Sequence, residues 1–228
     1  MFTEWINGLY QLDADLLLAI NGWHSSFFDS FMMVYSGKWI WVPMYAALLY
    51  TMLRNLSWKL LILGVISVAL VITITDQLTA TVLRPVIARL RPANLANPLS
   101  ELVHIVDGYR GGAYGFPSAH AANSFGLATT VWLLFRKPWL TSFFMAWAVL
   151  TCYSRAYLGV HYPGDLLAGT IIGVAAAWVV YRLYCWATGH RPVEHPKHLY
   201  APVLAGLLTI AGIAVYAFIN ARPAIFIL

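Results

Sequence analysis

The sequence predicts an all-helical membrane protein with six transmembrane helices, preceded by N-terminal helices that lie at the membrane interface. Hydrophobic residues make up 61% of the 228 residues and charged residues only 10%, against roughly 45–50% and about 25% in soluble domains. The apolar residues form runs close to the about 20 residues that cross a bilayer. One membrane domain over residues 1–228 fits this length.

The N-terminal region, residues 1–37, mixes apolar with acidic and polar residues too often to cross a bilayer. Its segments 13–21 and 27–35 are typical of short amphipathic helices lying at the interface. The first thirty residues lack a basic stretch and contain four acids, which argues against a cleavable signal peptide.

Six apolar runs follow, and a long polar loop separates the second from the third. We expect the spans at about residues 39–53, 60–83, 118–135, 139–153, 164–187 and 201–219. The loop, residues 84–117, holds most of the polar character of the chain, and loops this long are usually functional.

The short loops on one side of the six spans are basic. They carry a single acid, Glu194, beside Arg54, Lys59, Arg136, Lys137, Arg191 and Lys197. The positive-inside rule therefore places them in the cytoplasm and the loop 84–117 with the turn 154–165 on the outer face. The net charge of +5 therefore does not indicate nucleic-acid binding. The basic residues set the orientation of the protein in the membrane or bind anionic lipid head groups.

The first of three polar clusters on the outer face begins the third span. Pro117 biases the preceding backbone toward extended conformations, and Ser118 stands where a helix N-cap is preferred. The free N–H groups of the first turn, including that of Ala119, form an anion site. His120 in that turn can give a proton to a leaving oxygen. Alone, the pattern is equally typical of a capped helix with an interfacial histidine.

The second cluster precedes the fifth span and contains Ser154, Arg155, His161 and Asp165. A carboxylate in the first helical turn can accept the N–H of one ring nitrogen of His161, which leaves the other free to attack phosphorus. Arg155 can hold phosphoryl oxygens with two hydrogen bonds. A His–Asp pair that only braces the loop is the alternative.

The third cluster follows the second span. Arg84 and Arg91 are two helical turns apart and would share a face if the helix continues, although Arg91 before Pro92 favours extended backbone. Both arginines could clamp the oxygens of a transferring phosphoryl group, as could Arg89 between them. Arginines that only extend toward the membrane surface are the alternative.

Together the clusters resemble the three motifs of the type 2 phosphatidic acid phosphatase (PAP2) family, Lys-x6-Arg-Pro, Pro-Ser-x-His and Ser-Arg-x5-His-x3-Asp. The second and third motifs match fully, with Ala119 where glycine is common, and the first has Arg84 in place of lysine. Arginine keeps the charge but is longer and forked. The resemblance covers about residues 60–190. The motifs here read Arg84-x6-Arg91-Pro92, Pro117-Ser118-Ala119-His120 and Ser154-Arg155-x5-His161-x3-Asp165.

The resemblance implies a metal-independent lipid phosphatase that works through a phosphohistidine. It implies that His161 is the nucleophile, that Asp165 orients it and that His120 protonates the leaving group and then activates water. It implies phosphate binding by Arg84, Arg91, Ser118, Ala119 and Arg155. No metal or other cofactor is implied, and the sequence agrees, since it offers no carboxylate cluster or Cys/His spacing for a catalytic ion.

The small size and the run of residues 114–124 are similar to bacterial members that act on lipid A or undecaprenyl diphosphate. We therefore expect a multi-pass protein of the bacterial inner membrane with its site facing the periplasm and a phosphorylated lipid as substrate. Phosphatidylglycerophosphate and phosphatidic acid are alternative substrates. Transfer of the phosphate to a second lipid, or binding and transport of an anionic lipid without catalysis, are alternative functions. Six apolar spans argue against the soluble vanadium haloperoxidases, which resemble the same motifs.

Overall fold

The computed structural model describes residues 2–189 and 196–221, which form helices joined by loops and contain no β-strand. The basic-loop residues Arg191 and Glu194 lie outside this part of the chain. The helices are α1 (Phe2–Asn21), α2 (Ser26–Tyr35), α3 (Val42–Asn55), α4 (Trp58–Asp76), α5 (Arg84–Ile87), α6 (Ala119–Phe135), α7 (Pro138–Tyr157), α8 (Pro163–Thr188) and α9 (Tyr200–Asn220). Short 3₁₀ turns cover Trp39–Trp41 and Pro98–Glu101, and a π-helical segment covers Gln77–Leu83.

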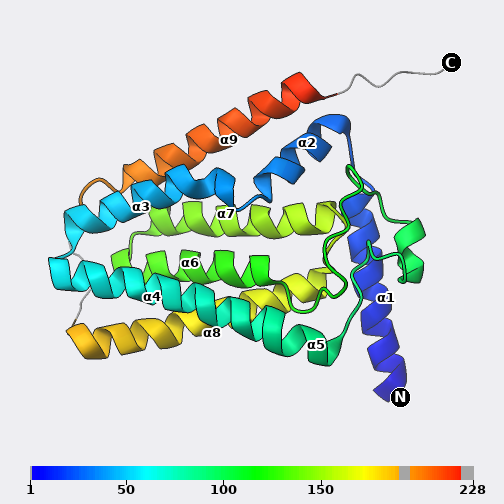
Figure 1. Cartoon of the computed structure of the whole chain (residues 1–228), viewed down its shortest axis with the longest axis horizontal. Helices are drawn as coiled ribbons and strands as arrows, with labels where there is room; N and C mark the ends of the chain where they lie inside the picture. The colour runs from blue at the N-terminus through cyan, green and yellow to red at the C-terminus, as the bar shows by residue number, and fades with distance from the viewer. Residues whose placement is uncertain (1, 190–195, 222–228) are drawn as a thin grey trace.

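Helix α6 forms the centre of a helical bundle, and α1 crosses one end of it (Figure 1). Helix α6 packs most extensively against α8, and also against α7 and α4, while α3 packs against α9. Thirteen of its residues, from Ala119 to Phe135, are buried, as expected for a helix that is apolar all round. The loop 88–118 and the turn 158–162 gather beside α1, and we call this the loop end of the bundle.

The close packing of α6 on α8 depends on two glycines four residues apart. A Cβ atom at Gly169 would collide with the carbonyl oxygen of Ser118, and one at Gly173 with that of Ala122. Small residues at this spacing let two helix backbones approach. The Ser118 N–H donates to the carbonyl of Asp165 at 3.0 Å, so the same contact brings two predicted site segments together.

The second expected span continues further than its apolar run. Helix α4 passes through the π-helical segment into α5 and ends only at Ile87, where Ala88 adopts a left-handed conformation with φ 48°. The expectation that the long loop starts at Arg84 is therefore wrong by four residues. A proline cannot donate its own N–H and crowds the preceding turn, and a π-helical widening of the turn before Pro85 relieves that crowding. Helix α1 is also longer than the short helix expected at 13–21.

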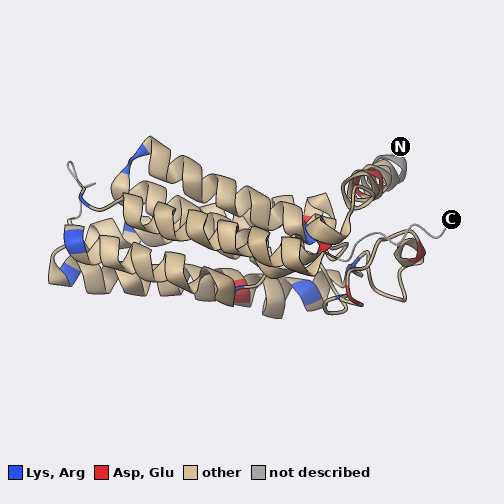
Figure 2. Cartoon of the chain, turned by 90° about the horizontal axis from the view of Figure 1, so that it is seen from above, with Lys and Arg blue, Asp and Glu red and all other residues tan. Residues whose placement is uncertain are grey.

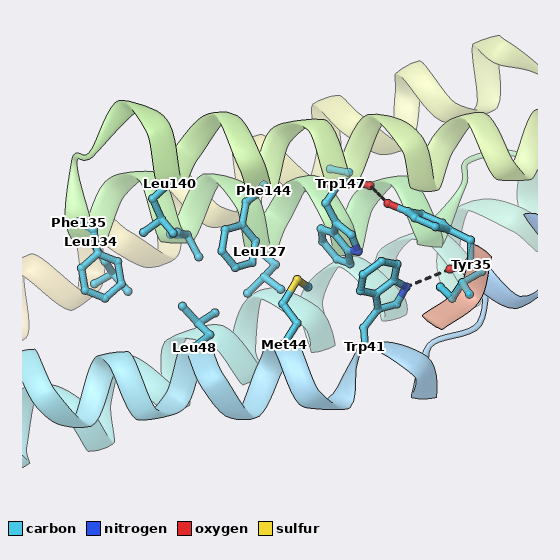
Figure 3. Packing of buried hydrophobic residues seen from close by; sticks show 14 of the residues in the cluster. Tyr35, Trp41, Met44, Leu48, Leu127, Leu134, Phe135, Leu140, Phe144 and Trp147 are labelled. Carbon is cyan, nitrogen blue, oxygen red and sulfur yellow. Dashed lines mark hydrogen bonds between the residues drawn. The ribbon is translucent and has the colours of Figure 1, made fainter. Parts of the chain in front are cut away.

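The junction between α2 and α3 is fixed against α7 by aromatic side chains (Figure 3). The indole N–H of Trp41 donates to the Tyr35 carbonyl at 3.0 Å, and the Tyr35 hydroxyl donates to the Trp147 carbonyl at 3.2 Å. The rings of Trp41 and Trp147 meet edge to face, with centroids 5.7 Å apart. The polar atoms of Trp41 and Tyr35 are thus satisfied while their rings are buried, which fixes this corner of the core.

Three of the described helices are long and apolar enough to cross a membrane: Trp58–Ile87, Pro163–Thr188 and Tyr200–Asn220. The other expected spans correspond to α3, α6 and α7. Charges are segregated along the bundle. Lys and Arg, and no Asp or Glu among the described residues, mark the end where α3 joins α4 and α6 joins α7, whereas acids gather toward the loop end (Figure 2). The prediction of an all-helical membrane fold is confirmed.

Candidate active site

His161 lies at the centre of the candidate site, fully buried in the turn between α7 and α8. Its Nε2 atom is 2.8 Å from Nη1 of Arg91. A guanidinium can only donate, so Nε2 accepts and the ring proton resides on Nδ1. The Nδ1 atom faces Oδ2 of Asp165 at 3.5 Å. The ring thus carries its lone pair on Nε2, the side where the arginine lies.

The surroundings keep His161 neutral. Burial lowers the pKa of its imidazole well below the usual value, and the charges of Arg91, Arg155 and Arg84 lower it further. Burial also lowers the pKa of Arg91 to about 10, and the charges of Arg84 and Arg155 act in the same direction. At neutral pH the site therefore holds a charged arginine beside an unprotonated imidazole, as a nucleophilic histidine requires.

Asp165 is held by groups on its far side. Its Oδ1 accepts from Nη1 of Arg89 at 2.8 Å, and its Oδ2 accepts from the backbone N–H of Tyr162 at 3.0 Å. Arg89 in turn pairs through Nη2 with Asp13 of α1 at 2.7 Å. Asp13 also accepts from the N–H of Gly164 at 2.7 Å. Arg89 thus supports the carboxylate instead of clamping phosphate as the sequence suggested, and helix α1 forms the back of the site.

The three arginines of the motifs approach His161 from other elements. Arg84, at the start of α5, donates to the carbonyl of Pro117 at 3.3 Å, and Arg155 of α7 donates to the Tyr109 hydroxyl at 2.9 Å. Arg91 is not on a helix with Arg84, so the shared helical face is not formed. Its extended backbone pairs with the segment before α6, and its N–H donates to the Ala113 carbonyl at 3.1 Å.

Several buried donors at this point have no partner within the described residues. They are Nε of Arg84, Nε of Arg91, Nε of Arg155 and Nδ1 of His161. A buried donor left without a hydrogen bond costs about 1–3 kcal/mol, and more when it is charged. The three arginine donors around one imidazole indicate a site arranged for an anion.

The first turn of α6 completes the site. Ser118 caps the helix, because its hydroxyl accepts from the N–H of Ala121 at 3.4 Å, as predicted. The N–H groups of Ala119 and His120 fall in the first turn, where helical N–H groups lack intrahelical partners. His120 is half-buried and lies within electrostatic reach of Arg155, His161 and Arg91. The structure thus brings all eight predicted site residues to the loop end.

Gly115 lies at the candidate site, although the sequence did not indicate it because it belongs to none of the three motifs. A Cβ atom there would lie 2.8 Å from Oδ2 of Asp165, 3.3 Å from Cγ of Arg91 and 3.6 Å from Nδ1 of His161. The buried backbone of Gly115 is therefore packed against the His–Asp pair. Asp13 and Arg89 were missed as supports because neither belongs to a motif.

A cavity of about 690 Å³ extends from His120 between α3, α4 and α6. Its lining is mainly apolar, and five of the lining residues are labelled in Figure 3: Tyr35, Trp41, Leu48, Leu127 and Trp147. The polar exceptions include Asp76, Lys38 and Asn123. Apolar lining residues include Trp41, Leu48, Met52, Val65, Ile72, Leu127 and Trp147. The cavity can hold hydrocarbon next to the imidazole of His120.

Several known proteins are similar to this chain. The model of the PAP2 superfamily matches residues 64–188. A lipid A 4'-phosphatase of Bacteroides thetaiotaomicron is 47% identical over 223 residues, covering 94% of this chain and 99% of that protein. An undecaprenyl-diphosphatase of Sulfolobus acidocaldarius is 33% identical over 150 residues, covering 65% and 64%. The crystal structure of Aquifex aeolicus LpxE aligns with a TM-score of 0.52 at 22% identity, covering 74% and 93%.

Proposed function

The chain belongs to the PAP2 superfamily and is a lipid phosphatase, and we propose that it removes a phosphate from lipid A. The observation that carries the proposal is the meeting of two features. Unpartnered buried donors surround His161, and an apolar cavity ends at His120. An anionic head group with hydrocarbon chains satisfies both. The relative that is 47% identical along nearly the whole chain is named a lipid A 4'-phosphatase, which favours lipid A as the substrate.

The reaction we propose proceeds in two displacements. Nε2 of His161 attacks phosphorus and forms an N–P bond as the bond from phosphorus to the lipid oxygen breaks. His120, which becomes protonated when the anionic head group binds, gives this proton to that oxygen. His120 then takes a proton from water, whose oxygen attacks phosphorus, breaks the N–P bond and releases inorganic phosphate. Each step transfers one proton through His120, so the enzyme returns to its starting state.

Arg91 has two successive roles in this scheme. In the free protein its Nη1 donates to Nε2 of His161, the proposed nucleophile, at 2.8 Å. It also donates to the Val160 carbonyl at 2.8 Å. An incoming phosphate offers anionic oxygens, which attract the guanidinium more strongly than a neutral nitrogen does. Arg91 then moves from the nucleophile to the phosphate, and Arg84, Arg155 and the first turn of α6 stabilise the developing charge.

Asp13 and Arg89 position the nucleophile without touching the substrate. Arg89 holds Oδ1 of Asp165, so that Oδ2 remains directed at Nδ1 of His161. The carboxylate can then stabilise the imidazole as its Nε2 becomes bonded to phosphorus. The guanidinium of Arg89 is itself fixed over the ring of Tyr162, with its carbon 3.9 Å from the ring centroid.

We further propose that six helices cross the bacterial inner membrane as one domain, with the loop end facing the periplasm. The basic opposite end supports this orientation, since positively charged short loops remain in the cytoplasm. Acyl chains would then enter from the membrane between α3, α4 and α6, and the phosphate would meet His161 near the outer surface.

Phosphate release by the purified protein in detergent with EDTA tests the proposal. The substrates are lipid A, undecaprenyl diphosphate, phosphatidylglycerophosphate and phosphatidic acid. We expect lipid A to react fastest, His161→Ala to abolish release, and His198→Ala, at the opposite end, to leave it unchanged. Phosphate release by the His161→Ala variant would contradict the assignment of His161 as the nucleophile. Loss of release in the presence of EDTA would contradict a metal-independent reaction.

Undecaprenyl diphosphate is the second candidate substrate, favoured by the relative named an undecaprenyl-diphosphatase. Its single long chain fits an apolar cavity as well. If it reacts faster than lipid A in the same panel, the substrate is reassigned. Transfer to a second lipid is tested by adding an acceptor lipid, since a transferase would then form a new phospholipid at the expense of free phosphate.

A further inference from the structure

A second cluster of polar side chains lies at the loop end, apart from His161. His24 comes from the turn between α1 and α2, Asp29 from the first turn of α2, and His104 from the long loop. Nε2 of His104 is 3.0 Å from both carboxylate oxygens of Asp29. The rings of His24 and His104 are stacked, with centroids 3.7 Å apart and planes 5° from parallel. We propose that these three residues bind a divalent transition-metal ion.

The distances fit a metal site. One nitrogen or oxygen atom from each residue lies within 4.8 Å of the other two. Ligand atoms bound to one tetrahedral zinc ion are about 3.4 Å apart, because each lies about 2.0–2.2 Å from the metal. Small side-chain movements therefore bring the three atoms onto one ion, and water completes the fourth position.

Two of the three ligands are held in place by buried groups. The side chain of Asn21, itself buried, accepts from the His104 N–H at 2.7 Å and donates to the His104 carbonyl at 3.0 Å. The hydroxyl of the buried Tyr157 donates to Oδ1 of Asp29 at 2.7 Å. Metal-binding carboxylates are oriented by such outer hydrogen bonds. The backbone of one ligand and the carboxylate of another are thus fixed before any ion arrives.

The third ligand, His24, is free to move. Its side chain is exposed, and its ring makes no hydrogen bond with any described residue. Parallel stacked rings cannot direct their nitrogens at one ion, so binding requires the His24 ring to tilt away from His104. This movement breaks the stacking contact with His104.

The ligand set defines the class of ion. Two imidazoles and one carboxylate suit Zn²⁺, Ni²⁺ or Cu²⁺, whereas Mg²⁺ and Ca²⁺ prefer all-oxygen sites. The role is structural, because the site lies apart from the phosphate donors. Asn21 also donates to the Tyr157 carbonyl at 2.7 Å, and the His104 segment packs on Gly159, two residues before His161. A bound ion would tie the α1–α2 turn to the segment that carries the nucleophile.

Zinc binding to the full chain tests the proposal. The protein is purified in detergent, its affinity tag is removed and metal is stripped with EDTA, which is then dialysed away. ZnCl₂ is titrated by calorimetry, and unfolding is followed with and without the ion. We expect one Zn²⁺ per chain and a rise in Tm, because a ligand that binds only the folded state stabilises it. Bound Co²⁺ should give the visible spectrum of a tetrahedral site.

Two variants and one control identify the ligands. His24→Ala removes an exposed ring, and Asp29→Asn keeps the acceptor for Tyr157, so both should fold with the Tm of the metal-free wild type. Each should weaken Zn²⁺ binding at least about tenfold, the lower range for lost support of a metal site. His198→Ala should bind as the wild type does. Equal binding by His24→Ala, or no stoichiometric binding by the wild type, would overturn the proposal.

Discussion

The two sides of His161 differ in how their polar groups are satisfied. Behind the ring, Asp165, Arg89 and Asp13 form a continuous chain of ion pairs that reaches helix α1. In front of the ring, Arg84, Arg91 and Arg155 each keep a buried Nε without a partner among the described residues. The ion pairs of the first, paired side are formed without substrate, whereas the arginine Nε–H groups of the second, open side would gain partners from a bound anion. The ion pairs behind the ring therefore stabilise the folded chain. In the mechanism we propose, the arginines in front of the ring stabilise the negative charge of the transition state.

The largest loss of stability and activity is expected when the ion pairs behind His161 are broken. Arg89→Gln leaves the carboxylate of Asp165, which is 1% exposed, without its charged partner. Removing one member of a buried ion pair destabilises a protein by about 3–5 kcal/mol. We expect a large fall in Tm in detergent together with loss of activity.

Asp13→Asn is the milder version of the same change, because the amide oxygen still accepts from Gly164. It should lower kcat with a smaller loss of stability. Asp15→Asn, at an exposed position of the same helix, is the matched control and should change neither quantity. A stable, fully active Arg89→Gln would refute the supporting role of the ion-pair chain.

Removing a positive charge from the open side, in front of His161, should lower activity strongly and stability only slightly. Arg155→Gln deletes a buried guanidinium whose Nε has no partner, so we expect little change in Tm. Loss of one donor that stabilises a transition state typically lowers kcat by about 10²–10³. Parallel measurements of kcat and Tm check this. A strong fall in Tm with kcat preserved would show that Arg155 is structural.

A methyl group added at Gly115, between the two sides, should lower both activity and stability moderately. Gly115→Ala would place a Cβ atom 2.8 Å from Oδ2 of Asp165 and displace the carboxylate from His161. Misplacing a catalytic group by about 1 Å can lower the rate about 10²-fold, and overpacking costs about 1–3 kcal/mol. Gly112→Ala is the control, since a Cβ atom there meets nothing within 4 Å. Equal activities of the two variants would contradict the packing argument.

The difference between the two sides also explains what the sequence could predict. The open side consists of motif residues whose chemistry is recognisable from residue type and spacing, and all of them gather at one end of the bundle. The paired side depends on contacts between distant segments. Asp13 lies in a helix with no motif, 152 positions from Asp165 in the numbering, and only tertiary packing brings Arg89 between them. The continuation of α4 past Arg84 was equally hidden, because proline normally ends a helix.

The smallest expected effect is a pH dependence of stability caused by His161. Burial lowers the pKa of its imidazole well below the usual value of 6.5, so below pH 6.5 the unfolded chain binds a proton that the folded chain excludes. The resulting stability is fully present above pH 6.5 and is lost as the pH falls toward the lowered pKa. One proton corresponds to at most about 1.4 kcal/mol per pH unit. Unfolding of wild type and His161→Gln between pH 7 and pH 5 measures it. The wild type should lose more stability than the variant over this range, whereas parallel curves would mean that folding leaves the pKa of His161 unchanged and would contradict the effect of burial on it.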